Sequence, residues 1–323
     1  KKAYGVNVVI DDVLAVDPAT LSVRLASGTT LFADRIVLAP GIDFDPVPGL
    51  TNADAMPHAW KAGPQTTLLR QQLQAMPANG VAVLTIPKVP YRCPPGPYER
   101  ACLLADWLKK YKPQAKLLVL DANLDFVTEK DNFSQAFFGL HANVIEYRTQ
   151  TEVLSADADT MTLQTTTGSV HGDVINLIPR QRCGPIVSET GLANATEGRF
   201  AAVDVLSYES TVAPGIHVIG DSSATTQPKA GHIANQEAKV CADAIVRSFG
   251  GYSADPAPVT NSACFSTITM KEASWLEAVF QYDPSTRVMV PVANATGASV
   301  GWSRNNFDQM ETWFKALMAD TFA

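Results

Sequence analysis

Short apolar runs separated by turn residues make up the first 41 residues of the chain. The runs GVNVVI, VLAVDP, SVRLAS and TTLFA are divided by residues that favour turns, such as Asp17-Pro18 and Ser27-Gly28. This pattern predicts an antiparallel meander. The next run, RIVLAPG, is continuously apolar up to Pro40-Gly41, which is typical of a buried strand.

The middle of the chain alternates between helical and strand patterns. Helices are predicted over 65–76, 98–110 and near 132–140, and strands at VAVLTIP (81–87) and KLLVLDA (116–122). A β-α-β-α order indicates a parallel, doubly wound sheet. Further strands are predicted at NVIEYR, TMTLQTT and VINLIP.

The run GIHVIGDSS predicts a strand that ends at Gly220-Asp221, and a long helix is predicted to follow over 231–249. A glycine lets the backbone approach a ligand, an aspartate accepts hydrogen bonds from hydroxyls, and a helix start offers free N–H groups. The pattern therefore favours a phosphate or polyol site. After Gly251 the character changes: NSACFSTITM alternates like a strand and 306–321 predicts a terminal helix.

Composition narrows the class of protein. The net charge of −7 argues against nucleic acid as a partner, because phosphate binding needs a basic surface. The longest apolar runs are too short for a transmembrane segment. Five cysteines without a C-x-x-C pair lack the usual zinc and thioredoxin motifs. Cys102 and Cys241 fall on apolar helix faces and are predicted to be buried.

The stretch YRCPPGPYERAC contains the strongest candidate chemistry. Its proline run cannot lie inside a helix or a strand, so it forms a stiff turn that fixes Cys93 in place. Glu99 follows near a helix start, either as a simple partner of the helix dipole or as a general base. Arg100 is interpreted as a solvated or salt-bridged helix residue.

Several motifs together resemble the flavoprotein subunit of flavocytochrome c sulfide dehydrogenase, within the disulfide-reductase-like flavoenzymes. They are IVLAPGI, PHAWKAG, PYRCPPGPYERA, ESTVAPGIHVIGD, PKAGHIANQEAKV and NSACFSTI. The resemblance implies an α/β, two-domain flavoprotein with a C-terminal α+β interface domain. Residues 1–54 and 186–254 would form the FAD-binding domain, 55–185 an NAD(P)-domain-like domain, and 255–323 the interface domain.

Two departures from related flavoproteins are visible. The sequence contains no G-x-G-x-x-G turn, so the FAD-binding domain is expected to be incomplete, lacking its N-terminal dinucleotide-binding βαβ unit. In addition, KVPYRCPPGP stands where NAD(P)H-dependent relatives carry a glycine-rich turn. This bulky turn cannot bring backbone N–H groups close to a pyrophosphate, so we expect no NAD(P)H binding.

The resemblance also implies site residues. Cys93 and Cys264 would form a redox-active disulfide that sulfide attacks, with Glu99 as a base. A helix start beside the flavin would stabilise its anionic reduced form. The implied flavin contacts are Pro40, Gly41, Gly220, Asp221, Pro228, Lys229, Ala230, Gly231 and Trp313. His58 and Trp60 fit the family pattern without an assigned role.

The implied activity is oxidation of sulfide to sulfur or polysulfide, with FAD passing electrons to a c-type cytochrome subunit that carries haem c. Such a partner places the protein in the periplasm, where disulfides persist. One alternative is a sulfide:quinone reductase-like enzyme, which would need an apolar surface for the membrane. The other is a redox-inactive flavoprotein remnant that only docks a cytochrome.

Overall fold

The computed structural model describes residues 5–322. The first strands form the predicted antiparallel meander, β1 (Val13–Asp17), β2 (Ser22–Leu25) and β3 (Thr30–Phe32). The prediction of a strand at 5–10 is wrong, because these residues pair with no other strand among the described residues and Ile10 is 95% exposed. Apolar side chains there have no partner strand to pack on, so composition alone misled the prediction.

A five-stranded sheet joins distant parts of the chain. β4 (Ile36–Leu38) pairs in parallel with β16 (Ile216–Val218), and β15 (Glu209–Ser210), β14 (Ala201–Asp204) and β17 (Ser223–Ala224) complete the sheet. β5 (Ile42–Phe44) pairs with β13 (Gln181–Cys183), and α4 spans Pro185–Glu189. We propose that these segments, from either side of the middle of the chain, make up one discontinuous FAD-binding domain.

The middle of the chain forms a parallel sheet of order β12-β6-β7-β8. Its strands are β6 (Val81–Ile86), β7 (Lys116–Asp121), β8 (Ile145–Arg148) and β12 (Val174–Asn176), as predicted. Helices α1 (Pro64–Ala75), α2 (Gly96–Tyr111) and α3 (Lys130–Gln135) accompany it, and α3 continues as a π-helix over Ala136–Leu140.

Side chains of β7 alternate between two cores, which explains why this strand is apolar on both faces. Leu117 and Val119 join a core that includes residues of α1 and α2. Leu118 and Leu120 join a second core with an antiparallel layer that sequence analysis found only in part. That layer consists of β9 (Val153–Asp157), β10 (Thr162–Thr165) and β11 (Gly168–His171).

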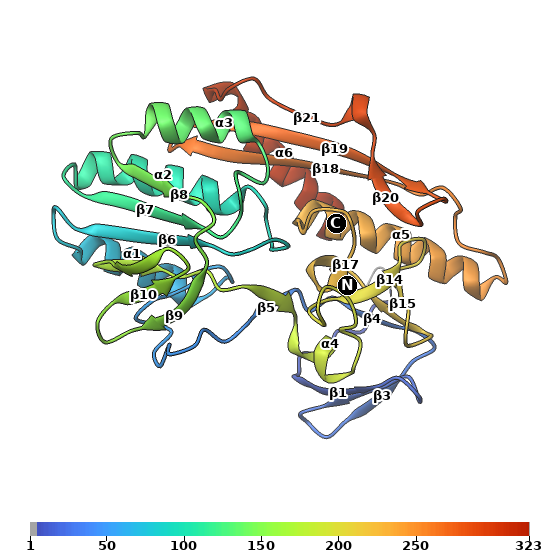
Figure 1. The fold of residues 1–323 in the computed structure, drawn as a ribbon. Helices are drawn as coiled ribbons and strands as arrows, with labels where there is room; N and C mark the ends of the chain where they lie inside the picture. Colours follow the sequence, from blue (N-terminus) through green and yellow to red (C-terminus); the bar gives the residue numbers. More distant parts are fainter. Residues whose placement is uncertain (1–4, 323) are drawn as a thin grey trace.

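The C-terminal part of the chain lies across both the part with the five-stranded sheet and the part with the parallel sheet (Figure 1). The long strands β18 (Val259–Thr269) and β19 (Glu272–Asp283) form a hairpin, with β20 (Val288–Pro291) and β21 (Gly297–Ala298) beside β19. β18 packs against both α2 and α5 (Gly231–Phe249), and α6 (Arg304–Phe322) packs on β19. The strand that carries Cys264 therefore lies between the α2 region and the α5 region.

Among residues 5–322, no helix combines the length and apolar character that crossing a membrane requires.

Candidate active site at the Cys93 turn

Cys93 occupies a constrained turn directly before α2. Its φ of 58° lies in the left-handed region, which L-residues other than Asn and Asp rarely adopt. Its N–H donates to the carbonyl of Lys229 (2.7 Å), and its carbonyl accepts from the N–H of Gly96 (2.9 Å). These bonds fix the cysteine against the loop that precedes α5, so the proline turn holds Cys93 as the sequence predicted.

Gly96 leaves space for the sulfur. A Cβ at this position would lie 2.8 Å from Cys93 Sγ and 2.9 Å from Cη2 of Trp60. Both atoms flank the same point, so the indole ring and the sulfur are neighbours. The glycine in PPGPYER is explained by this contact, because any Cβ there would displace the sulfur or the ring.

Cys93 and Cys264 are both free in this structure, so the disulfide implied for the oxidised protein is not formed here and stays a prediction. Burial is the main cause that raises the pKa of each thiol, for Cys264 to about 12, and nearby Cys264 further raises the pKa of Cys93. At neutral pH both groups are thus neutral thiols. Cys102 and Cys241 are free and buried, as predicted.

Glu99 connects α2 to the strand of Cys264. Its Oε1 accepts from the N–H of Thr267 (3.0 Å) and from Thr267 Oγ1 (2.5 Å). Burial raises the pKa of Glu99, while the bonds from Thr267 oppose that shift. The Glu99 carboxylate also contributes to the raised pKa of both Cys93 and Cys264. It therefore lies within electrostatic reach of both sulfurs.

Glu129 is a second carboxylate at the site, which sequence analysis did not identify. It accepts from Ser266 Oγ (2.6 Å) and Ser274 Oγ (2.5 Å), and both serines are fully buried. Its charge also raises the pKa of Cys264. Glu129 belongs to no motif, because its partners are 137 and 145 residues further along the chain.

Arg100 corrects an expectation, because its side chain is only partly exposed and it forms no ion pair with any residue in 5–322. It donates to the carbonyls of His58 (3.1 Å) and Ala59 (2.7 Å) and to Oδ1 of Asn176 (2.9 Å). Its guanidinium carbon lies 4.5 Å from the centre of the Trp60 ring. Burial lowers the pKa of Arg100 to about 10.

This arrangement gives the PHAWKAG stretch a structural role. Trp60 is stacked under Arg100, and its Nε1 donates to the carbonyl of Arg92 (3.2 Å). The backbone of His58 and Ala59 anchors Arg100 in return. Together these contacts hold the indole ring of Trp60 in place as the wall beside Cys93.

Four of the residues implied to contact flavin line one cavity of about 550 Å³: Gly41, Gly220, Asp221 and Gly231. Gly41 and Gly220 have left-handed φ values of 73° and 68°. Asp221 forms an ion pair with Arg92 (2.5 Å), and α5 begins at Gly231 on the same cavity wall. An aspartate beside a helix start fits the hydroxyls of a ribityl chain, so this part of the site fits a flavin.

Lys229 does not line this cavity. Its Nζ donates to the carbonyls of Asp221 (2.9 Å) and Ser223 (2.6 Å) and lies 3.8 Å from the Phe200 ring centre. Burial lowers its pKa to about 8. Pro228 and Ala230 flank it in the loop before α5. The lysine charge is held among backbone carbonyls, where it fixes the Gly220–Asp221 turn.

Pro40 and Trp313 lie outside this cavity lining. Pro40 packs against Gly184, where an added Cβ would meet Pro40 Cβ at 2.7 Å. Trp313, on α6, packs near Phe265 (5.6 Å between ring centres), which directly follows Cys264. The Trp313 Nε1 is buried without a hydrogen-bond partner in the part of the chain that is described.

The edge where doubly wound domains bind nucleotides is filled with protein. At the end of β7, Asp121 is fully buried and accepts from the hydroxyls of Tyr98 (2.8 Å) and Tyr147 (2.7 Å). Relatives that bind NAD use an acidic residue at this place for the ribose. Here the carboxylate is occupied.

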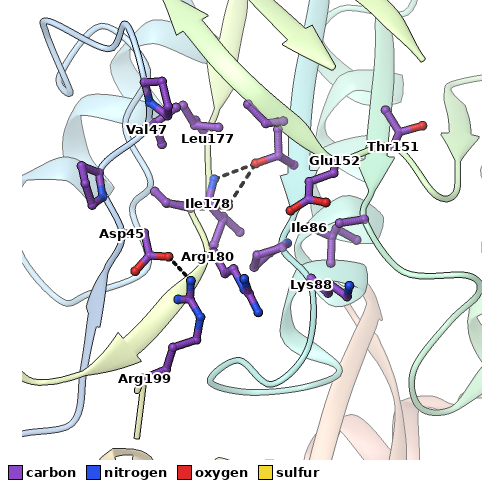
Figure 2. A pocket seen from close by; sticks show the side chains of 17 residues that line it. Asp45, Val47, Ile86, Lys88, Thr151, Glu152, Leu177, Ile178, Arg180 and Arg199 are labelled. Carbon is purple, nitrogen blue, oxygen red and sulfur yellow. Dashed lines mark hydrogen bonds and ion pairs between the residues drawn. The ribbon is translucent and has the colours of Figure 1, made fainter. Parts of the chain in front are cut away.

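A crevice does remain at the carboxyl ends of β6 and β12, between Ile86, Lys88, Ile178 and Arg180 (Figure 2). Its volume is about 240 Å³. Ordinary ligand pockets hold about 300–1,000 Å³. The crevice is therefore too small for a dinucleotide.

The fold and these groups define an α/β flavoprotein of the disulfide-reductase type. Residues 66–179 match the family model of the sulfide dehydrogenase (flavocytochrome c) flavoprotein chain, central part, and residues 256–322 match that of its flavin-binding part. The two matches cover more than half of the chain. The chain belongs to the family of flavocytochrome c sulfide dehydrogenase flavoproteins, as the sequence motifs predicted.

Solved structures share the fold. The sulfide:quinone oxidoreductase of Aquifex aeolicus matches with a TM-score of 0.71 at 16% identity, over 100% of this chain and 78% of that chain. A pyridine nucleotide-disulphide oxidoreductase of Desulfovibrio vulgaris gives 0.52 at 14% identity, over 95% and 82%. An NAD-dependent persulfide reductase of A. fulgidus gives 0.55 at 13% identity, over 96% and 62%.

Proposed function

We propose that the protein oxidises sulfide at a Cys93–Cys264 disulfide and passes the electrons through FAD to a c-type cytochrome subunit in the periplasm. The observation behind this proposal is that Cys93, Glu99 and Cys264 lie within electrostatic reach of one another, with Glu99 bonded to the strand of Cys264. Membership of a flavocytochrome c flavoprotein family supports the cytochrome partner and its haem c.

The residues suggest how the sulfur step proceeds. Hydrosulfide attacks one sulfur of the disulfide, so that a new S–S bond forms and the old one breaks with its electron pair on the other cysteine. Because burial raises the pKa of both thiols, that cysteine is a poor leaving thiolate. It leaves more easily when it receives a proton.

We expect Glu99 to move that proton. Thr267 bonds only to Oε1, which leaves Oε2 to take the proton of hydrosulfide and deliver it to the leaving sulfur. The raised pKa of Glu99 brings it closer to neutrality, where a base and acid can alternate. When the disulfide re-forms from the persulfide and the thiol, the outer sulfur leaves as zero-valent sulfur or as part of a sulfur chain, and bound FAD would accept the two electrons released. Gly41, Gly220, Asp221 and the start of α5 would hold it.

The test is anaerobic stopped-flow mixing of the flavin-loaded protein with sulfide, followed by acceptor assays with cytochrome c and with a soluble quinone. We expect rapid bleaching of the flavin and reduction of the cytochrome. Reduction of quinone alone would favour the sulfide:quinone alternative. Absence of a flavin spectrum after loading, or a flavin that sulfide does not bleach, would refute the proposal.

A further inference from the structure

A groove of about 1190 Å³ runs along the outer face of α2, between α1 and the turn that joins β18 to β19. Arg100, Leu104, Trp107 and Tyr111 follow it from the first turn of α2 to the last. Residues at this spacing share one helix face, so the groove is elongated along the helix axis.

The walls of the groove are apolar in the middle. Leu69 and Leu73 of α1 face Leu104 and Trp107 of α2, and Met270 closes one side from the β18–β19 turn with 58% of its surface exposed. A ligand here would remove apolar surface from water. The groove therefore favours an occupant with an apolar, elongated body.

Positive charge surrounds this apolar middle. Arg70, Lys110 and Lys271 line the groove, and none of them forms an ion pair with any residue in 5–322. Two carboxylates, Asp106 and Glu272, also line the groove; Asp106 accepts from the N–H of Met270 (3.0 Å) and Glu272 from Oγ1 of Thr269 (3.4 Å). In a protein with a net charge of −7, this local excess of free cations selects for an anion.

The inner end of the groove reaches the wall of the Cys93 site. Arg100 lines the groove and stacks on Trp60 at 4.5 Å. The Trp60 ring and Cys93 Sγ both lie against Gly96, within 2.9 Å of the place a Cβ would occupy. Two stacked side chains thus separate the groove from the sulfur.

We propose that this groove binds linear polysulfide dianions. The identity of the ligand rests on the proposed function, because sulfide oxidation at Cys93 produces sulfur chains. Such a chain has an apolar body of sulfur atoms and a negative charge at each end. Its body fits the leucine and tryptophan walls, and its ends pair with Arg70, Lys271 or Arg100.

The test measures binding without turnover. A Cys93→Ser/Cys264→Ser variant, with its fold checked by the flavin spectrum, is dialysed anaerobically against sodium tetrasulfide, and bound sulfane sulfur is counted by cyanolysis. We expect saturable binding of one tetrasulfide per chain. Adding Arg70→Gln and Lys271→Gln is expected to raise the Kd about tenfold, since each exposed charge contributes modestly.

The matched control adds Arg24→Gln and Lys116→Gln, which also remove two positive charges that form no ion pair with any residue in 5–322 but do not line the groove. Its Kd is expected to stay within twofold of the parent. No saturable binding, or an equal loss of affinity in both variants, overturns the proposal. Because the parent variant lacks both reactive cysteines, the result is independent of sulfide turnover by the wild-type protein, and failure of the proposed function is seen separately.

Discussion

Replacing Gly96 with alanine tests whether the geometry of Cys93 controls the reaction. The new Cβ would lie 2.8 Å from Cys93 Sγ and 2.9 Å from Trp60 Cη2. Contacts between such atoms are normally at least about 3.5 Å, so the sulfur or the ring must move by about 0.7 Å. Trp60 is held by Arg100 and by the carbonyl of Arg92, so the sulfur is the group that moves.

The expected effect is large on rate and small on stability. Displacement of a reacting group by about 1 Å costs on the order of 10²-fold in rate. Gly96 is the first residue of α2, where helix propensity counts for little, so the loss of unfolding free energy is the overpacking cost of about 1–3 kcal/mol. We therefore expect a folded, flavin-binding variant whose reduction by sulfide is about 100-fold slower.

The assay is stopped-flow bleaching of the flavin by sulfide, with thermal unfolding measured on the same samples. Gly139→Ala is the matched control, because a Cβ at Gly139 has no atom within 4 Å. A Gly96→Ala variant with the wild-type bleaching rate would show that the position of Cys93 Sγ does not limit the reaction, and our account of the turn would be wrong.

Three further predictions concern the same site. Non-reducing peptide mapping of the oxidised protein is expected to recover Cys93 joined to Cys264, and recovery of Cys93 as a free thiol would exclude the disulfide mechanism. Glu99→Gln is expected to slow flavin reduction by about 10²–10⁴-fold while keeping the bond to Thr267. Burial raises the pKa of Glu99, so wild-type activity should fall on acidification at a higher pH than for an ordinary glutamate; identical pH profiles would reduce Glu99 to a structural residue. NADH is expected to leave the flavin oxidised, because Asp121 is occupied by two tyrosines, and tight NADH binding would contradict this.

Elements with a long, regular pattern were predictable from the sequence. The helix predicted over 231–249 is α5, and the strand predicted at 81–87 is β6. The helix buries one face, and the strand is apolar throughout because Leu84 and Val83 enter two different cores, so local pattern and tertiary packing give the same answer in both. The apolar run at 5–10 failed because a strand needs a neighbour, which periodicity does not supply.

The site was predictable only where a motif marks it. Cys93 lies in the proline-rich turn and Glu99, six residues later, in the first turn of α2, close enough for its charge to raise the pKa of Cys93. Arg100 looked like a surface residue because its acceptors, the carbonyls of His58 and Ala59, are more than 40 residues earlier. The inward direction of Lys229 depends in the same way on carbonyls that no pattern reveals.

The contacts of Glu99 and Glu129 constrain which segments of this protein can be exchanged between relatives. Thr267, Ser266 and Ser274 belong to the C-terminal hairpin, and both carboxylates that bind them come from the middle of the chain. A chimera that takes its hairpin from a distant relative without matching hydroxyls would leave Glu99 with the N–H of Thr267, and Glu129 with the amide of Asn132, in place of the present sets of donors. Recombination between relatives should succeed best when the middle of the chain and the C-terminal hairpin come from the same parent. The two glutamates and the three hydroxyl residues should therefore be gained or lost as a set.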